Sequence, residues 1–149
     1  MEVTKLKYSV LMFIVGQGAW ADVVSDGRLA HGAWECAAKA GVSESYVEQS
    51  EGLFDLGYNI LSRIISEAKS GETPEEELDD LPVGITWRIS GGPSTDFQLG
   101  ALWTHYTIDA YDETWPDIVG AAFDVQENLQ MKAADADFQT KNCEFLVPQ

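Results

Sequence analysis

The stretch ESYVEQSEGLFDLGYNILSRIISEAK, residues 44–69, decides the fold class of this chain. Its apolar residues recur every three or four positions, which places them on one face of an α-helix. Ser43 precedes the stretch as a natural N-cap, and Gly71 follows it as a stop. The sequence therefore predicts a long amphipathic helix that must bury one face against other helices. Its apolar stripe consists of Tyr46, Val47, Leu53, Phe54, Gly57, Ile60, Leu61, Ile64, Ile65 and Ala68.

A helix is also predicted on the N-terminal side of this stretch, over residues 26–40, with Gly41 as its stop. Helical spacing divides its side chains into two faces. The polar face carries Arg28, Glu35 and Lys39. The opposite face is mostly small and apolar, which would let another helix approach closely. It consists of Leu29, Ala33, Cys36, Ala37 and Ala40.

Three further helices are predicted on the C-terminal side. A short linker helix opens at Thr73-Pro74 and ends before Pro82. A helix from Pro93 to about Asp112 is apolar over most of its circumference, so we expect it to be the central element of the fold. A last helix begins near Trp115-Pro116 and runs past residue 130.

The segment 83–90 has an ambiguous pattern. Val83, Ile85, Trp87 and Ile89 alternate with smaller or polar residues, which is the periodicity of a β-strand. A strand needs a partner, and the sequence offers only the tail around 144–147. We expect an extended segment or a short irregular helix here. The fold class is therefore all-α: four main helices and a short linker helix in one domain over residues 22–149.

Residues 1–21 are predicted to be a secretory signal peptide. Lys5 and Lys7 precede an apolar run over residues 8–15, and Ala19-Trp20-Ala21 provides the small residues that signal peptidase accepts. The run is too short to span a bilayer, which takes about 20 apolar residues. We therefore expect cleavage before Asp22, a periplasmic or secreted protein, and no membrane insertion after cleavage.

The chain is strongly acidic, with 25 Asp and Glu residues against 9 Lys and Arg, a formal net charge of −16. Such a charge argues against a nucleic-acid partner, because phosphate contacts require Lys and Arg. It permits a cationic protein partner, and it also keeps a protein soluble without any partner.

The chain has two cysteines, Cys36 and Cys143. In an oxidising compartment such a pair predicts one disulfide, which here would tie the first helix to the C-terminal tail. The alternatives are two free thiols or a metal pair, but the spacing is not that of a metal motif.

Two pairs of residues could ligate a metal or serve a hydrolase. His31 and Glu35 are four residues apart on one predicted helix, and His105 and Asp109 are four apart on another. Metal sites in helical bundles are built from such pairs on facing helices. Both pairs, however, lie on the polar sides of their helices, where solvated side chains are usual. No nucleophile motif of the GxSxG or SxxK type occurs, and we expect no cofactor.

An aromatic set in or beside the helix over 93–112 is the remaining candidate. Most of its members belong in a core, but any that are exposed within an acidic rim would mark a protein-binding surface. The set consists of Trp87, Trp103, Tyr106, Tyr111 and Trp115.

The combination of signal peptide, helical bundle and disulfide is similar in gross plan to small periplasmic immunity proteins that neutralise toxins attacking the cell wall. No sequence motif of such proteins is matched, so the resemblance implies no site residues. We expect a protein that acts by binding another protein, as an inhibitor or immunity protein does. A metal-binding protein or hydrolase using His31/Glu35 and His105/Asp109 is the alternative.

Overall fold

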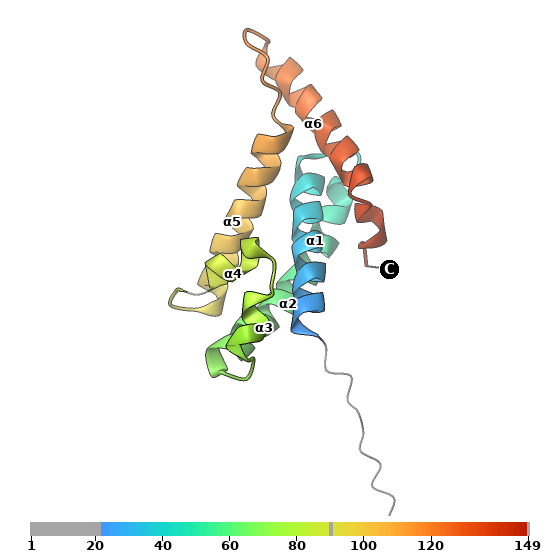
Figure 1. Ribbon diagram of the computed structural model, residues 1–149. Coiled ribbons are helices and arrows are strands. Elements are labelled where there is room, and N and C mark those ends of the chain that lie inside the picture. Colours follow the sequence, from blue (N-terminus) through green and yellow to red (C-terminus); the bar gives the residue numbers. More distant parts are fainter. Residues whose placement is uncertain (1–21, 90, 149) are drawn as a thin grey trace, which may run out of the picture.

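The computed structural model describes residues 22–89 and 91–148, and all regular elements within these ranges are helical (Figure 1). The signal peptide predicted for residues 1–21 lies outside them. The all-α prediction is confirmed, with four long helices and one disulfide. The α-helices are α1 (Val23–Val42), α2 (Ser50–Ser70), α3 (Glu75–Asp79), α4 (Val83–Ile89), α5 (Thr95–Thr114) and α6 (Phe123–Thr140). Two short 3-10 helices, η1 (Val47–Gln49) and η2 (Cys143–Phe145), lie before α2 and after α6.

The helix at the centre of the fold is α1, not α5 as the sequence suggested. It pairs with α2 as an antiparallel hairpin and also contacts α5 and α6 (Figure 1). Its buried side chains are mostly small, which lets three long helices approach one axis. The predicted apolar face is wrong at Leu29, which is exposed, and Lys39 is buried although it was placed on the polar face.

The indole of Trp34 fills the middle of the main core and is fully buried. Its ring stacks on Phe54 with centroids 5.6 Å apart, and it meets Trp103 and Tyr106 edge-on at 5.5 and 5.7 Å. Nε1 donates a hydrogen bond of 2.9 Å to the backbone carbonyl of Phe54. A buried indole N–H therefore has a partner, and α1, α2 and α5 share one aromatic cluster.

A second, smaller core surrounds the disulfide between Cys36 and Cys143, whose Cα atoms are 5.5 Å apart. The bond confirms the predicted pairing of the first helix with the tail. Phe138 of α6 packs beside it and stacks on Tyr46, with ring centroids 4.2 Å apart. Closing so long a loop stabilises a fold by up to about 4.7 kcal/mol in the chain-entropy model.

The extended alternative for 83–90 is wrong, because Val83–Ile89 forms α4. The carbonyl of Pro82 accepts the backbone N–H groups of Ile85 and Thr86 at 2.7 and 3.1 Å, which starts the helix. Ile85 is fully buried against the main core. The alternating pattern was misleading because helical turns can also place a single buried residue among exposed ones.

The last helix starts at Phe123, eight residues later than predicted, because residues 115–122 form a loop. Gly120 in this loop has a φ of 84°, a left-handed conformation that favours glycine. Ser43 likewise does not cap the long helix. It ends α1, and its hydroxyl accepts the backbone N–H of Tyr46 at 2.8 Å.

Asp135 on α6 connects the turn after α1 to α6 through hydrogen bonds. Its carboxylate accepts hydrogen bonds from the hydroxyls of Ser43 and Ser45 and from the backbone N–H of Ser45. Burial raises the pKa of Asp135, but these hydrogen bonds outweigh burial and leave the pKa below its usual value. This contribution to stability is therefore present at neutral pH and is lost as the pH falls through the lowered pKa.

Gly57 on α2 makes room for Trp34, which gives a direct test of this core. A Cβ atom at Gly57 would lie 2.3 Å from Cδ1 of Trp34. We expect Gly57→Ala to lower the free energy of unfolding by about 1–3 kcal/mol in urea titration, because the ring has to shift within a packed core.

Gly52→Ala on the same helix is the matched control. Its Cβ would meet only Pro148 at an ordinary 3.6 Å, so the better helix propensity of alanine should leave stability unchanged or raised. Equal effects of the two substitutions would contradict this description of the core.

Candidate functional site

The two predicted His/carboxylate pairs face a single polar cleft between α1, α4 and α5. His31 and Glu35 reach it from α1, and His105 and Asp109 reach it from α5. Arg88 of α4 also lines it. The structure therefore brings all four predicted side chains to one place, although they are far apart in the sequence.

His31 is held on both sides by protein groups. Nδ1 lies 2.6 Å from the hydroxyl of Tyr106, and Nε2 lies 3.8 Å from a carboxylate oxygen of Glu35. Lys141 also approaches Glu35, with its Nζ 3.5 Å from the same oxygen. Burial, and then the negative charge of Glu35, raise the pKa of Tyr106 above its usual value. The phenol is therefore protonated at neutral pH and can donate its hydrogen to Nδ1 of His31.

The cleft does not have the form of a metal centre. Among residues 22–89 and 91–148, no three His, Cys, Asp or Glu side chains converge closely enough to hold an ion. Tyr106 and Glu35 face the two ring nitrogens of His31, which a metal would otherwise use. The volume of the cleft, about 70 Å³, suits a few water molecules and is far below that of a typical small-molecule pocket.

Lys39 of α1 also lines this cleft, and it connects α1 to α5 and α6 through ion pairs. Its side chain is only 3% exposed, and Nζ contacts Glu113 of α5 at 2.6 Å and Asp137 of α6 at 3.0 Å. A buried ammonium group requires such partners, because an unpaired charge in the interior is very costly. Lys39 therefore fixes the positions of α5 and α6 relative to α1. Its place among the alanines of α1 was the sequence signal for its burial.

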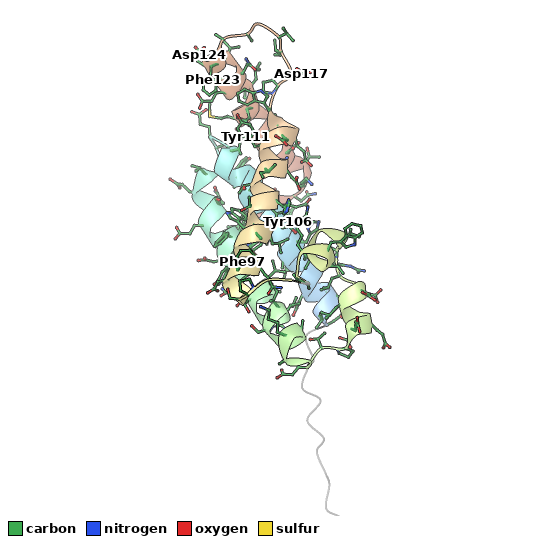
Figure 2. The ribbon with its side chains drawn as sticks, turned by 90° about the vertical axis from the view of Figure 1, so that its left-hand side faces the viewer. Phe97, Tyr106, Tyr111, Asp117, Phe123 and Asp124 are labelled. Atoms are coloured by element: carbon green, nitrogen blue, oxygen red, sulfur yellow. A yellow bond between two sulfur atoms is a disulfide. The ribbon has the colours of Figure 1, made fainter. Side chains whose placement is uncertain are left out.

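Beyond Lys39, α5 and α6 extend past the end of α1 and meet in the loop 115–122, so that they form a projecting arm (Figure 1). We call residues 116–127 at its end the tip. Val119 of the tip is 98% exposed and Phe123 is 66% exposed, and Ile118 and Val125 are exposed as well. Figure 2 shows Asp117, Phe123 and Asp124 at this end of the molecule, with Tyr111 below them. Large apolar side chains are thus presented to solvent at the point farthest from the core.

The predicted aromatic surface divides into separate parts. Trp103 and Tyr106 belong to the core, and Trp87 is exposed on α4. Tyr111 and Trp115 stack on each other with centroids 5.2 Å apart, and Trp115 is 5.9 Å from Phe123. These two extend the apolar surface of the tip down the arm. The sequence predicts a continuous helix from 115 onward, which hides Val119 and Phe123 as surface residues. In the structure Val119 lies in the loop and Phe123 is the first residue of α6, and both are exposed.

The arm carries a one-sided charge. Residues 109–131 contain no Lys or Arg. In the part of the chain that the structure describes, Glu113 is the only acid of this segment with a cationic partner. An apolar tip with an acidic rim is therefore the second candidate site. Its acids are Asp109, Asp112, Glu113, Asp117, Asp124 and Glu127.

Comparisons with models of protein families, with curated proteins and with solved structures find no match to this chain. Within the described residues, none of the helices is long and apolar enough to cross a membrane. The function therefore has to be inferred from the cleft and the tip.

The ion pairs of Lys39 predict an asymmetry between two variants. In Lys39→Met, the side chains of Glu113 and Asp137 are 60% and 42% exposed and can be hydrated, so we expect a loss of only about 1 kcal/mol. In the double variant Glu113→Ala/Asp137→Ala, the ammonium group is buried without a partner, and we expect a loss of about 3 kcal/mol.

Chemical denaturation of the two proteins at neutral pH measures the difference. A larger loss for Lys39→Met than for the double variant would show that Lys39 is held by its packing and not by its two carboxylates.

Proposed function

We propose that this protein is exported and acts by binding another protein through the tip of the α5–α6 arm. The observation that carries the proposal is the set of exposed apolar side chains at the tip, centred on Val119 and Phe123, inside a rim of acids. Among the described residues, Glu113 is the only one of these acids with a cationic partner. Exposed apolar groups gathered at one place, with a polar rim, are typical of protein-binding surfaces.

The shape and the charge of the tip favour a particular kind of partner. A narrow end that projects from the body of the protein is suited to a concave surface, such as the cleft of an enzyme. The acids of the rim favour a basic surface around that cleft, since opposite charges speed association and exclude wrong partners. An inhibitor or immunity protein would use such a tip to block the partner's site.

Two features support a location outside the cytoplasm. Residues 1–21 have the order of a signal peptide, with a basic start, an apolar run and a small-residue cleavage site. The disulfide between Cys36 and Cys143 is of a kind that persists in oxidising compartments and is rare in the cytosol. A periplasmic or secreted protein that meets its partner there is the simplest interpretation of both features.

The second candidate is a metal-binding protein or hydrolase that uses the polar cleft. It is favoured by one observation, that His31, Glu35, His105 and Asp109 all line that cleft. The small volume of the cleft and the existing partners of His31 make it the weaker proposal.

Site-specific photo-crosslinking tests the tip. A photoreactive phenylalanine analogue in place of Val119 should crosslink to a basic protein in the extracytoplasmic fraction of the source cells, and the yield should fall as the salt concentration rises. The substitution Phe123→Asp should reduce this yield at least tenfold, because it places a charge in the apolar centre of the contact.

The same photoreactive group at Val83, which is exposed on α4, is the matched control and should give no specific product. Identical products from positions 83 and 119, or none from position 119, would contradict the proposed surface.

Metal analysis separates the two candidates. If the cleft is not a metal centre, the purified protein should retain well under one equivalent of Zn, Fe or Mn after extensive dialysis. Stoichiometric metal that is lost in both His31→Ala and His105→Ala would establish the cleft as a metal site instead.

A further inference from the structure

The outer face of α5, turned away from α1, carries an apolar seam. Its members are spaced four, three, four, three and four residues apart, which is the repeat of a coiled-coil contact. Phe97 is 57% exposed, Ile108 49% and Tyr111 46%. Figure 2 looks onto α5 from this side, with Phe97 near the start of the helix and Tyr111 near its end. The seam consists of Phe97, Ala101, Thr104, Ile108 and Tyr111 on α5, together with Trp115, which follows the last residue of α5 and stacks on Tyr111.

The seam is distinct from the face of α5 that holds the fold together. That other face buries Leu99, Leu102, Tyr106 and Ala110 against the core. A helix that is apolar on two faces is normally covered on both. Within residues 22–89 and 91–148 of one copy, α5 lies at the left edge of the molecule in Figure 1, and none of the described helices covers its outer side.

We propose that this seam is the interface of an antiparallel dimer, in which α5 of one copy packs against α5 of a second copy. Two-fold symmetry requires that the surface complement itself, so that each contact occurs twice. One register brings all six seam residues into contact. It pairs Phe97 with Trp115, Ala101 with Tyr111, and Thr104 with Ile108, so that the smallest residue lies opposite a large one. Shifting the register by seven residues either way leaves seam residues without partners.

The edges of the seam permit the close approach that this pairing needs. Gly100 and Thr107 line one edge, and both are small and uncharged. His105 and Asp112 line the other edge. In the proposed register Asp112 lies at the level of Gly100 of the second copy, not of another acid. The seam itself contains no charged residue, so packing buries no unpaired charge.

The available area is at the lower limit for a specific dimer. From the exposed fractions of the seam side chains, each copy would bury about 500 Å², or about 1,000 Å² in total. This is close to the minimum for a biological interface and predicts a weak dimer, with a dissociation constant on the order of micromolar.

The dimer is a separate interaction from the one proposed for the tip. The two surfaces share Tyr111 and Trp115, but Ile118, Val119 and Phe123 lie beyond the seam. The dimer also differs in its response to salt. Two copies that each carry a formal charge of −16 repel each other, so salt should strengthen the dimer. Contact of the acidic tip with a basic partner should weaken in salt, and the two interactions can therefore be told apart.

Sedimentation equilibrium of the intact, disulfide-bonded protein tests the proposal. We expect a monomer–dimer equilibrium at micromolar concentrations, with a dissociation constant that falls as NaCl is raised over roughly a tenfold range, from about 50 to about 500 mM. Ile108→Asp should weaken dimerisation at least tenfold, whereas Val83→Asp, which adds the same charge at an exposed site on α4, should leave it unchanged.

Circular dichroism of both variants establishes that they are folded. A monomer up to about 100 micromolar at high salt would overturn the proposal, as would a dimer that survives Ile108→Asp.

Added cysteines test the antiparallel register with a short bismaleimide crosslinker. In Thr104→Cys the two thiols would be displaced by about 6 Å along the helix axis, and we expect a crosslinked dimer. In Phe97→Cys they would be about 27 Å apart, and we expect none. Crosslinking at position 97 instead would show parallel packing and overturn the proposed register.

Discussion

The packing of the Trp34 indole against the bare backbone of Gly57 is the contact on which the rest of the structure depends. It lets two long helices, α1 and α2, lie close enough to pack as one hairpin, and it leaves the ring edges free to meet Trp103 and Tyr106 of α5. The other helices are then arranged around α1. The ring also lies directly beside the polar cleft, because Tyr106, which it contacts, is one of the residues that line the cleft.

The sequence predicted the fold well where the pattern was long and regular. The apolar stripe from Leu53 to Ile65 could be recognised because helical periodicity is visible in neighbouring residues. The pairing of Cys36 with Cys143 could be predicted because the chain has only these two cysteines. The sequence predicted the fold poorly where tertiary contacts determine the secondary structure or the arrangement of the helices. The choice of α4 as helix depends on the burial of Ile85, and the central position of α1 depends on which small residues meet three neighbours.

The candidate sites, like the fold, were predictable from local sequence patterns but not where they depend on tertiary contacts. The spacing of His31 with Glu35 and of His105 with Asp109 identified the polar side chains, but only the packing of α1 beside α5 shows that they share a cleft. The exposed tip could not be seen in the sequence, because its apolar residues continue the pattern of the helix that follows. The alanines around Lys39 were a signal for its burial, but its two partners, Glu113 and Asp137, are distant in sequence and could not be identified from it.

The disulfide has a consequence for the exposed loop at the end of the arm. Cys36 and Cys143 are 107 residues apart, and the covalent ring that they close contains the whole of α2, α5 and α6. A protease that nicks the chain at Val119 would therefore leave both fragments attached to each other through the two sulfur atoms. A protein of this design can be cut at an exposed loop and still hold its helices in one particle, which would separate only after reduction.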